Sequence, residues 1–551
     1  MFTSTAPVHS GVPARGQEGV EAAMEPANLG MCNVCKEAVP AEFHVRQGQV
    51  WIRKQCPQCG LTESLVSNDA ATWQLKRDVW GYVPVDVQAC KLDCDRCRID
   101  HHPNLVFVDV TNRCNMNCPI CIATIRDMGF DFNPPLAYFE KLFAHIERMD
   151  PIPMVELFGG EPTVRDDLLE IIAIGRRHGI RPRVVTNGLR LADEDYARTL
   201  CDARVRMRFA FDGRSADIYE QLRHNRPAYE KKVKALENLD RFSRRRHAFI
   251  ACAARGINDR HMPDFLQYCH DHRDLISDLG IIPLAENWSG DEFDVQVRTT
   301  LEDVENMVKD AVPGGGVEFV PAGLSWCLRL PRSFFRKGTR SEVLLLAGVH
   351  PNCESMTLLI SDGKCYRGLG HYLKRPFSQM AAEGAEIARK IEPKLSRLDR
   401  DRFFQRVRGQ WLVLWSFGPW ALRRLRVGRF LGHTVTGWFR DIFRRLRRDV
   451  RTTAARHRRS ARVFRVAILP FEEYHSIDAA RLEHCKAVFA YEDVDDGAIK
   501  TIPACTWYEF RNPILKRIAK KYGKEDKVDP PTSEPPASAG GRLSVRAGGG
   551  G

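Results

Sequence analysis

Six short apolar runs alternate with amphipathic segments between about residues 103 and 290. In chain order the runs read NLVFVDVT, MVELFGGE, RPRVVTNG, RMRFAFDG, HAFIACAARG and DLGIIPLAE, and segments such as YFEKLFAHIERM, DLLEIIAIGRRHG and YEKKVKALENLDRF lie between them. Nearly continuous apolar strands separated by amphipathic helices are typical of βαβ units in a parallel sheet. We therefore predict an α/β fold with a partial (β/α)6 TIM-like barrel at 103–290, whose chemistry lies at the carboxyl ends of the strands.

The rest of the 551-residue chain divides by composition. Residues 1–28 and 524–551 are low in complexity and are expected to be disordered tails. Residues 29–102 are dense in cysteine and are predicted to form a small metal-binding domain. Residues 291–523 follow a less regular pattern and are predicted to form an irregular C-terminal region.

Cysteine usage points to metal binding. No run in the sequence is apolar for long enough to span a bilayer, and the N-terminus MFTSTAPVHSGVPARGQEG lacks the apolar core of a secretory signal. We therefore expect a cytoplasmic protein. Because that compartment keeps thiols reduced, the 18 cysteines indicate metal ligands in preference to disulfides.

Two CxxC pairs lie in the first cysteine-rich region. Cys32 and Cys35 belong to CNVC, Cys56 and Cys59 belong to CPQCG, and the strand-like piece VRQGQVWIRKQ separates the pairs. Each pair can direct two sulfurs at one ion, and a hairpin would bring the pairs together. The pattern predicts a mononuclear metal site. Zinc and rubredoxin-like iron use the same four ligands, so the metal stays open.

A tighter set of three cysteines follows the first apolar run of the barrel. Cys114, Cys118 and Cys121 lie in TNRCNMNCPICIA with the spacing C-x3-C-x2-C, on the expected first strand-to-helix loop. Three thiolates can hold three corners of a [4Fe–4S] cube. The fourth iron then has no protein ligand and can bind a small molecule.

With this loop the sequence resembles the radical S-adenosylmethionine (SAM) superfamily, and the run FGGEP at 158–162 extends the resemblance. The resemblance implies that Gly159 and Gly160 let the backbone approach the ligand, and that Glu161 accepts a hydrogen bond from the SAM ammonium. Further cofactor-binding candidates end the next two strands: Thr186 and Asn187 in TNG, and Asp212 in FDG.

A second C-x3-C-x2-C set, Cys90, Cys94 and Cys97, precedes the barrel in CKLDCDRC. We interpret it as part of an auxiliary cluster. The alternative is a structural zinc with His101 or His102 as the fourth ligand.

The remaining cysteines allow a count. Three are expected to be buried fillers inside barrel elements: Cys201, Cys252 and Cys269. Eight cysteines are then left, which is the number that two fully ligated cubanes require. Three of the eight form the second C-x3-C-x2-C set, and the other five are Cys327, Cys353, Cys365, Cys485 and Cys505. Of them, Cys353, Cys485 and Cys505 are the preferred metal ligands.

Taken together, the motifs resemble the tetraether lipid synthase family, which has relatives among pterin methyltransferases. The added motifs are GGEPTVRDDL, HPNC at 350–353 and a late IPAC. The resemblance implies a rubredoxin-like iron, a SAM cluster, auxiliary [4Fe–4S] clusters and an electron donor such as ferredoxin or flavodoxin. The lipid synthases of this family join the unactivated ends of lipid chains, so the resemblance also implies a lipid substrate and a C–C coupling reaction.

Positive charge is concentrated between residues 402 and 465, in a chain of formal net charge +13. Tryptophans and arginines are interleaved there, as in helices that lie in the interface of an acidic membrane. The alternative is an insertion packed on the barrel with a solvated basic face. Aromatic and arginine side chains also suit stacked RNA bases, but no RNA-binding motif is present, so no nucleic-acid partner is expected.

The sequence therefore predicts a radical SAM enzyme that cleaves SAM reductively and activates an unactivated C–H bond, of a lipid chain in the leading hypothesis. The first alternative keeps this chemistry but acts on a pterin-like molecule or a peptide. The second alternative, from another class, is a non-catalytic iron–sulfur electron carrier.

Overall fold

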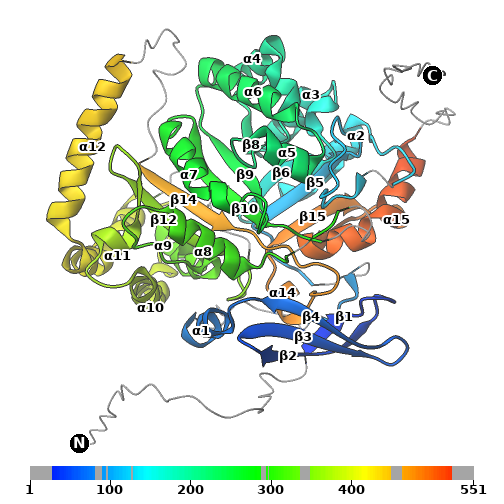
Figure 1. Cartoon of the computed structure of the whole chain (residues 1–551), viewed down its shortest axis with the longest axis horizontal. Coiled ribbons are helices and arrows are strands. Elements are labelled where there is room, and N and C mark those ends of the chain that lie inside the picture. Colours follow the sequence, from blue (N-terminus) through cyan, green and yellow to red (C-terminus); the bar gives the residue numbers. More distant parts are fainter. Residues whose placement is uncertain are drawn as a thin grey trace, which may run out of the picture.

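The computed structural model describes residues 28–80, 90–94, 97, 99–125, 128–286, 293–295, 297–335, 348–447 and 462–523. The two predicted tails lie outside these ranges, apart from Asn28. Figure 1 shows a curved central sheet covered by helices, with a smaller sheet packed below it.

The smaller sheet is antiparallel, with the strand order β1-β2-β3-β4. Its elements are β1 (Asn28–Met31), β2 (Ala38–Arg46), β3 (Gln49–Cys56), β4 (Gly60–Ser67) and the helix α1 (Ala70–Trp80). Alternate residues of β2 are buried, and the ring of Phe43 lies 5.3 Å from that of Trp73 in α1. This alternation gives the sheet one apolar face, which α1 covers.

The large sheet contains the six predicted strands in the predicted parallel order. They are β5 (Leu105–Thr111), β6 (Met154–Gly159), β7 (Arg183–Thr186), β8 (Arg206–Ala210), β9 (His247–Ala253) and β10 (Ile276–Pro283). Each strand pairs in parallel with the next one along the chain. The partial (β/α)6 barrel is therefore confirmed.

The C-terminal region is more regular than its sequence indicates. It adds β14 (Val463–Ile468) in parallel to β10, and β15 (Ala487–Glu492) in parallel to β5. Antiparallel strands then extend both ends: β11 (Val320–Pro321), β12 (Ser355–Ser361) and β13 (Tyr366–Gly368) beyond β14, and β16 (Ile499–Pro503) beyond β15. The sheet thus continues past the predicted boundary at residue 290, and the division into domains stays a prediction.

The two ends of the large sheet approach each other. Gly348, just before β12, forms an isolated antiparallel bridge with Cys485, just before β15. The open side of the barrel is therefore bordered by two segments of the C-terminal region.

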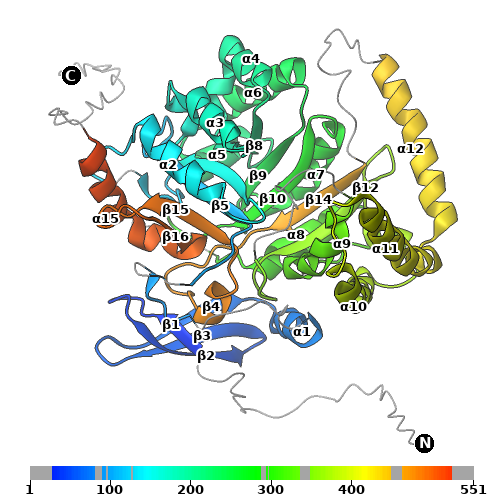
Figure 2. The same ribbon diagram turned by 180° about the vertical axis from the view of Figure 1, so that it is seen from behind.

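Helices cover the outer face of the sheet in both views (Figures 1 and 2). Those of the βα repeat are α2 (Leu136–Ile146), α3 (Leu168–Arg177), α4 (Glu194–Asp202), α5 (Ala216–Arg223), α6 (Ala228–Phe242) and α7 (Met262–Asp271). Those that follow are α8 (Leu301–Ala311), α9 (Arg329–Ser333), α10 (Phe377–Leu395), α11 (Phe403–Arg424), α12 (Val427–Arg447), α14 (Ala479–Leu482) and α15 (Ala504–Tyr522).

A buried charge cluster joins the small sheet to the barrel. Lys76 of α1 donates to Glu302 at 3.0 Å and to Glu305 at 2.6 Å, both on α8. The three side chains are at most 3% exposed. A buried lysine is stable as a cation only with such partners, so this contact fixes α1 against α8.

The basic segment contains two long helices at one edge of the molecule. In Figures 1 and 2, α12 stands along that edge, and α11 and α10 lie at its foot. Within the described ranges, none of the helices is both long and apolar enough to cross a bilayer.

Candidate functional site

The first cysteine loop leaves the carboxyl end of β5 and is closed at its base. The side chain of Asn112 accepts from Phe132 N–H at 2.8 Å and donates to the Phe130 carbonyl at 2.6 Å. Beside it, Arg113 forms two hydrogen bonds with the carboxylate of Asp131, at 2.8 and 2.6 Å. These contacts join residues 112–113 at the start of the loop to residues 130–132 at its end. The three cysteines therefore lie on one closed loop.

The three thiols of this loop lie near one another. Each of Cys114, Cys118 and Cys121 is within electrostatic range of the other two. Burial raises the pKa of the Cys118 thiol, although the Arg223 guanidinium and the Lys232 ammonium act in the opposite direction. Such thiols favour the thiolate form once a metal supplies positive charge.

The two glycines of the GGE run contact the cysteine loop. A Cβ on Gly159 would lie 2.3 Å from the Thr111 carbonyl oxygen, and one on Gly160 would lie 2.1 Å from that of Arg113. Gly160 N–H instead donates to the Thr111 carbonyl at 2.7 Å. The sequence analysis assigned these glycines to a close approach of the ligand. In the structure they allow a close approach of the cysteine loop's own backbone.

Glu161 joins the ends of β6 and β7. Its Oε1 accepts from the Thr186 hydroxyl at 2.7 Å and from Thr163 N–H and hydroxyl at 3.0 and 2.6 Å. Its Oε2 accepts from Asn187 N–H at 2.6 Å, and the residue is 1% exposed. Four donors thus already occupy the roughly four acceptor positions of this carboxylate, three of them on Oε1 and one on Oε2. The less crowded oxygen, Oε2, is the one to which the ammonium group assigned by the sequence analysis would bind.

Asn187 connects the end of β7 to the cysteine loop. Its Nδ2 donates to Asn115 Oδ1 at 2.8 Å and lies 4.0 Å from Cys114 Sγ. The next residue, Gly188, has φ +81°, and a Cβ there would lie 2.2 Å from the Phe209 ring. The predicted residues Gly159, Gly160, Glu161, Thr186 and Asn187 are therefore gathered around Cys114.

Asp212 is buried and already paired. It accepts from Arg223 at 3.0 and 2.9 Å and from Cys252 N–H at 2.9 Å. Lys232, 2% exposed, donates to the carbonyls of Asn187 and Ala210 at 2.5 and 2.6 Å. Burial lowers the pKa of this lysine to about 8, against the raising effect of Asp212.

Sequence reasoning missed Arg223 and Lys232. A signal for Lys232 was present, because it occupies a position of the apolar stripe of α6 that also contains Ala228, Ala235 and Leu239. A charged residue in such a stripe indicates a buried partner. Arg223, in the last turn of α5, carries no comparable signal.

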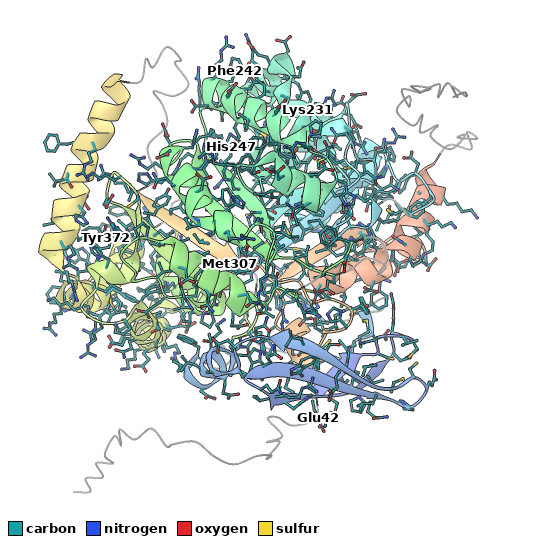
Figure 3. The ribbon with its side chains drawn as sticks, in the orientation of Figure 1. Glu42, Lys231, Phe242, His247, Met307 and Tyr372 are labelled. Carbon is teal, nitrogen blue, oxygen red and sulfur yellow. The ribbon has the colours of Figure 1, made fainter. Side chains whose placement is uncertain are left out.

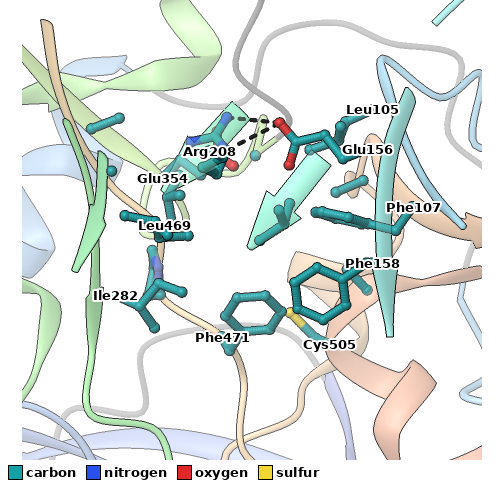
Figure 4. Close-up of a pocket in the computed structure, with 18 of the residues that line it drawn as sticks. Leu105, Phe107, Glu156, Phe158, Arg208, Ile282, Glu354, Leu469, Phe471 and Cys505 are labelled. Carbon is teal, nitrogen blue, oxygen red and sulfur yellow. Dashed lines mark hydrogen bonds and ion pairs between the residues drawn. The ribbon is translucent and has the colours of Figure 1, made fainter. Parts of the chain in front are cut away.

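A cavity of about 120 Å³ lies inside the barrel, next to the cysteine loop. Figure 4 shows Phe107, Phe158 and Phe471 around it, with the Glu156–Arg208 ion pair at one end and Cys505 at the other. That pair has an oxygen–nitrogen distance of 2.9 Å. Asp278, Glu354 and Arg465 line the cavity as well, and the first two lie within electrostatic range of Arg208. The cavity is thus lined mainly by apolar side chains and also by five charged ones.

Three distant cysteines converge on this cavity. Cys353, Cys485 and Cys505 all line it, and each lies within electrostatic range of the other two. Tyr508 also lines it and lies within range of both Cys121 and Cys505. The cavity therefore borders the first cysteine loop, through Ile122, and also the thiol set Cys353–Cys485–Cys505.

Cys327 and Cys365 do not lie with the thiol set Cys353–Cys485–Cys505. The thiol of Cys365 lies 3.9 Å from Asp362, the charged neighbours of Cys327 are Arg389 and Glu392, and neither cysteine lines the cavity. The structure therefore does not bring the eight counted cysteines together as two four-cysteine sets. Cys201, Cys252 and Cys269 are buried, as expected of fillers.

Cys90 and Cys94 lie against the small sheet, and Cys97 is within electrostatic range of Cys90. Cys94 is buried beside Met31 and Ile477, and Cys90 packs on the same cluster. Of the two histidines considered as ligands, His101 is buried with Nε2 3.6 Å from Cys97 Sγ. His102 has a side chain 68% exposed, directed at Asp100. The structure therefore favours His101 over His102 as a neighbour of this set.

The two CxxC pairs form a compact site. The sulfurs of Cys32, Cys35, Cys56 and Cys59 all lie within 4.8 Å of one another. In the part of the chain that the structure describes, this is the one group of three or more potential ligands gathered so closely. Sulfurs on a single tetrahedral ion are separated by about 3.8 Å. This site is therefore built for one ion.

Two family models match this architecture. Residues 108–269 match the radical SAM superfamily, and residues 29–68 match the HMPTM N-terminal zinc ribbon domain. The first match contains the cysteine loop and the GGE run, and the second contains both CxxC pairs. Residues 108–269 thus match a radical SAM domain, and the segment before them matches a zinc ribbon.

Relatives of the radical SAM domain act on different substrates. The chain is 28% identical to 7,8-dihydro-6-hydroxymethylpterin dimethyltransferase of Methanocaldococcus jannaschii over 304 residues, 53% of this chain and 60% of that protein. It is 30% identical to mycofactocin maturase MftC of Mycobacterium ulcerans over 133 residues, 24% of this chain and 35% of that protein. The match thus spans about 60% of the first relative's length and a third of the second's.

The solved structures that match this chain do so only distantly. anSMEcpe with bound AdoMet and the Cp18Cys peptide is 18% identical, with a TM-score of 0.30 over 38% of this chain and 59% of that one. Streptococcus suis SuiB bound to S-adenosylmethionine is 12% identical, with a TM-score of 0.33 over 48% and 67%. These likenesses are too distant to add to the description of the site.

The radical SAM domain supports a SAM-dependent enzyme and implies a [4Fe–4S] cluster. The donor set fits this group. Cys114, Cys118 and Cys121 would hold three irons, and the glycine contacts keep their loop against β6. The zinc ribbon site suits zinc or iron, and the further cysteine sets offer thiolates for auxiliary clusters.

Proposed function

We propose that the protein is a radical SAM enzyme that activates a C–H bond of a lipid chain. The observation that carries the proposal is the apolar cavity that extends from the cysteine loop into the barrel. A [4Fe–4S] cluster held by Cys114, Cys118 and Cys121, once reduced by an electron donor, would supply the electron that splits SAM into methionine and a 5′-deoxyadenosyl radical, and this radical would take hydrogen from an unactivated carbon.

The residues at the strand ends position the cofactors. Oε2 of Glu161, which accepts one hydrogen bond where Oε1 accepts three, receives the SAM ammonium, and Thr186 orients the carboxylate. Asn187 contacts the cysteine loop through Asn115. Asp212 acts indirectly, because its oxygens bind Arg223 next to Cys118.

The cavity supports an apolar substrate. Ile122, Phe158 and Phe471 line it, and such apolar walls exclude water from a reactive intermediate. The Glu156–Arg208 pair, at the end away from Cys505, can meet a polar group of the substrate. An alkyl chain with one polar end fits this arrangement.

The thiol set Cys353–Cys485–Cys505 lines the cavity and is proposed to hold an auxiliary cluster. We propose a second auxiliary cluster at Cys90, Cys94 and Cys97, and ferredoxin or flavodoxin as the electron donor. The proposed lipid substrate also implies contact with an acidic membrane through residues 402–465.

A second candidate keeps the same chemistry with a pterin-like substrate. It is favoured by the similarity to the pterin dimethyltransferase, which extends over 304 residues. The lining of the cavity is mainly aromatic and aliphatic, which suits a flat polar pterin less well than an alkyl chain. A peptide substrate would use the same radical chemistry, whereas a non-catalytic electron carrier would not cleave SAM.

The decisive experiment is anaerobic turnover of the purified, reconstituted protein with dithionite and SAM. We expect release of 5′-deoxyadenosine from the full chain and none from the Cys118→Ala variant. Equal release from both would overturn the proposal. An electron carrier would show no change in its cluster spectrum when SAM is added. Lipid profiles of cells with and without the protein then separate a lipid substrate from a pterin.

A further inference from the structure

Exposed large apolar side chains are concentrated on α11 and α12. Of the 18 such side chains in the described residues, ten belong to these two helices. Scattered exposed apolar residues are normal, but a concentrated set marks an interaction surface. The ten are Phe403, Phe404, Trp411, Leu414, Trp415, Leu422, Val427, Leu431, Val435 and Phe439.

On α11 the exposed residues form one straight stripe. Phe404, Trp411, Trp415 and Leu422 are separated by seven, four and seven positions. At about 100° per residue they project within about 40° of one another. Trp411 is 62% exposed and Trp415 is 77% exposed. Two indole rings therefore project from adjacent turns of the same helix face.

The opposite face of α11 attaches the helix to the body. Gly409 is buried, and a Cβ there would lie 2.2 Å from the Phe334 ring. Val413 is also buried, and Trp420 Nε1 donates to Glu383 of α10 at 2.8 Å. By helical geometry these positions lie about 140–180° from the stripe. The stripe is therefore directed away from the protein.

α12 likewise has one exposed apolar face and one face that contacts the rest of the protein. Its exposed residues Val427, Leu431, Val435 and Phe439 recur every fourth position. On the other side, His433 accepts from or donates to the hydroxyl of Tyr372 at 3.2 Å, and Arg440 donates to the Asp362 carbonyl at 2.8 Å. Tyr372 is labelled in Figure 3, on the side of α12 that faces the barrel.

The charge around the stripe has one sign. Residues 402–440 contain eight arginines and no aspartate, glutamate or lysine. Arg408 and Arg423 are exposed and, at about 40° and 100° from Phe404, border the stripe. A second protein would need an apolar groove with acidic edges, whereas an anionic bilayer offers both properties at any point of its surface.

We propose that α11 and α12 form a docking face for an anionic lipid bilayer, which they enter from the side without crossing. Trp411 and Trp415 lie at the level of the headgroups, and Arg408 and Arg423 contact lipid phosphates. This surface agrees with a lipid substrate but is argued from the helices alone. It is tested without SAM or reductant, so its failure and that of the proposed chemistry are distinguishable.

The test is flotation of the full chain with vesicles of phosphatidylcholine, alone or with phosphatidylglycerol. We expect binding that needs phosphatidylglycerol and falls about fivefold for each of Arg408→Gln and Arg423→Gln. The double variant Trp411→Ser/Trp415→Ser should reduce binding at least about tenfold. Leu61→Ser/Leu75→Ser, which changes two side chains 57% and 53% exposed on the small sheet and α1, serves as the matched control and should bind normally.

A measurement on the unaltered protein removes any dependence on variant folding. Brominated acyl chains should quench its tryptophan fluorescence when phosphatidylglycerol is present. The proposal is overturned if quenching is absent or if the tryptophan and control variants bind vesicles equally well. It is equally overturned if vesicle binding does not depend on phosphatidylglycerol. It is also overturned if the stripe covers a second copy of the chain, which sedimentation would show as a dimer that the tryptophan variant disrupts.

Discussion

Arg223 donates two hydrogen bonds to the carboxylate of Asp212, at 3.0 and 2.9 Å, directly behind the first cysteine loop. Burial by itself would raise the pKa of Asp212, but the charge of Arg223 lowers it. The guanidinium is also within electrostatic range of Cys118. This ion pair thus connects the end of β8 with the residues that surround the cysteine loop.

Removing Arg223 should destabilise the fold. Arg223→Ala leaves the Asp212 carboxylate, 3% exposed, without its cation, and breaking a buried pair typically costs about 3–5 kcal/mol. We expect a loss of this size in the free energy of unfolding measured with urea. Arg226→Ala is the matched control, because the Arg226–Asp217 pair has side chains 58% and 65% exposed. A similar loss in both variants would show that burial of the pair is unimportant.

Glu161→Gln should impair both folding and turnover. An amide nitrogen in place of one carboxylate oxygen sets a donor against the hydroxyls of Thr163 and Thr186 or against Asn187 N–H. The unsatisfied groups should cost about 1–3 kcal/mol of unfolding free energy, and release of 5′-deoxyadenosine should fall at least about tenfold.

The matched control for Glu161→Gln is Glu194→Gln, since the Glu194 carboxylate is 39% exposed at the start of α4. Glu194→Gln should change neither the free energy of unfolding nor the release of 5′-deoxyadenosine measurably. Normal SAM-dependent turnover by Glu161→Gln would contradict the assigned role.

A methyl group on Gly160 should displace the cysteine loop. Its Cβ would lie 2.1 Å from the Arg113 carbonyl oxygen, and backbone must move to relieve that contact. In Gly160→Ala we expect loss of iron from the Cys114–Cys118–Cys121 set and little 5′-deoxyadenosine. Gly418→Ala, where the new Cβ meets no atom within 4 Å, should retain both. Full iron content in Gly160→Ala would show that the loop tolerates the shift.

The zinc ribbon site should bind one ion that stabilises the small sheet. Cys35→Ala removes one of four ligands within 4.8 Å of one another, so metal analysis should show the loss of one equivalent of zinc or iron. Proteolysis should then increase within residues 29–68, because a ribbon of this size depends on its metal. Cys269→Ala, at a buried cysteine of α7 outside the four sets, is expected to keep the metal.

Local sequence patterns were sufficient to predict the alternation of strands and helices in the barrel and the first cysteine loop. Strand-to-helix alternation depends on neighbouring residues, so β5 to β10 could be predicted from their apolar runs. The spacing within TNRCNMNCPICIA likewise belongs to one short segment. The strands β14 and β15 escaped prediction because their partners, β10 and β5, are far away in the sequence.

The sequence by itself determined which cysteines can act together when they lie within a few residues, as in the CxxC pairs and the two C-x3-C-x2-C sets. Only the tertiary structure joined Cys353, Cys485 and Cys505 at the cavity and excluded Cys327 and Cys365 from it. It likewise set Arg223 beside Asp212 and turned Trp411 and Trp415 outward. The physical reason is that spacing fixes geometry only over a few bonds, whereas contacts between distant segments depend on how the whole sheet closes.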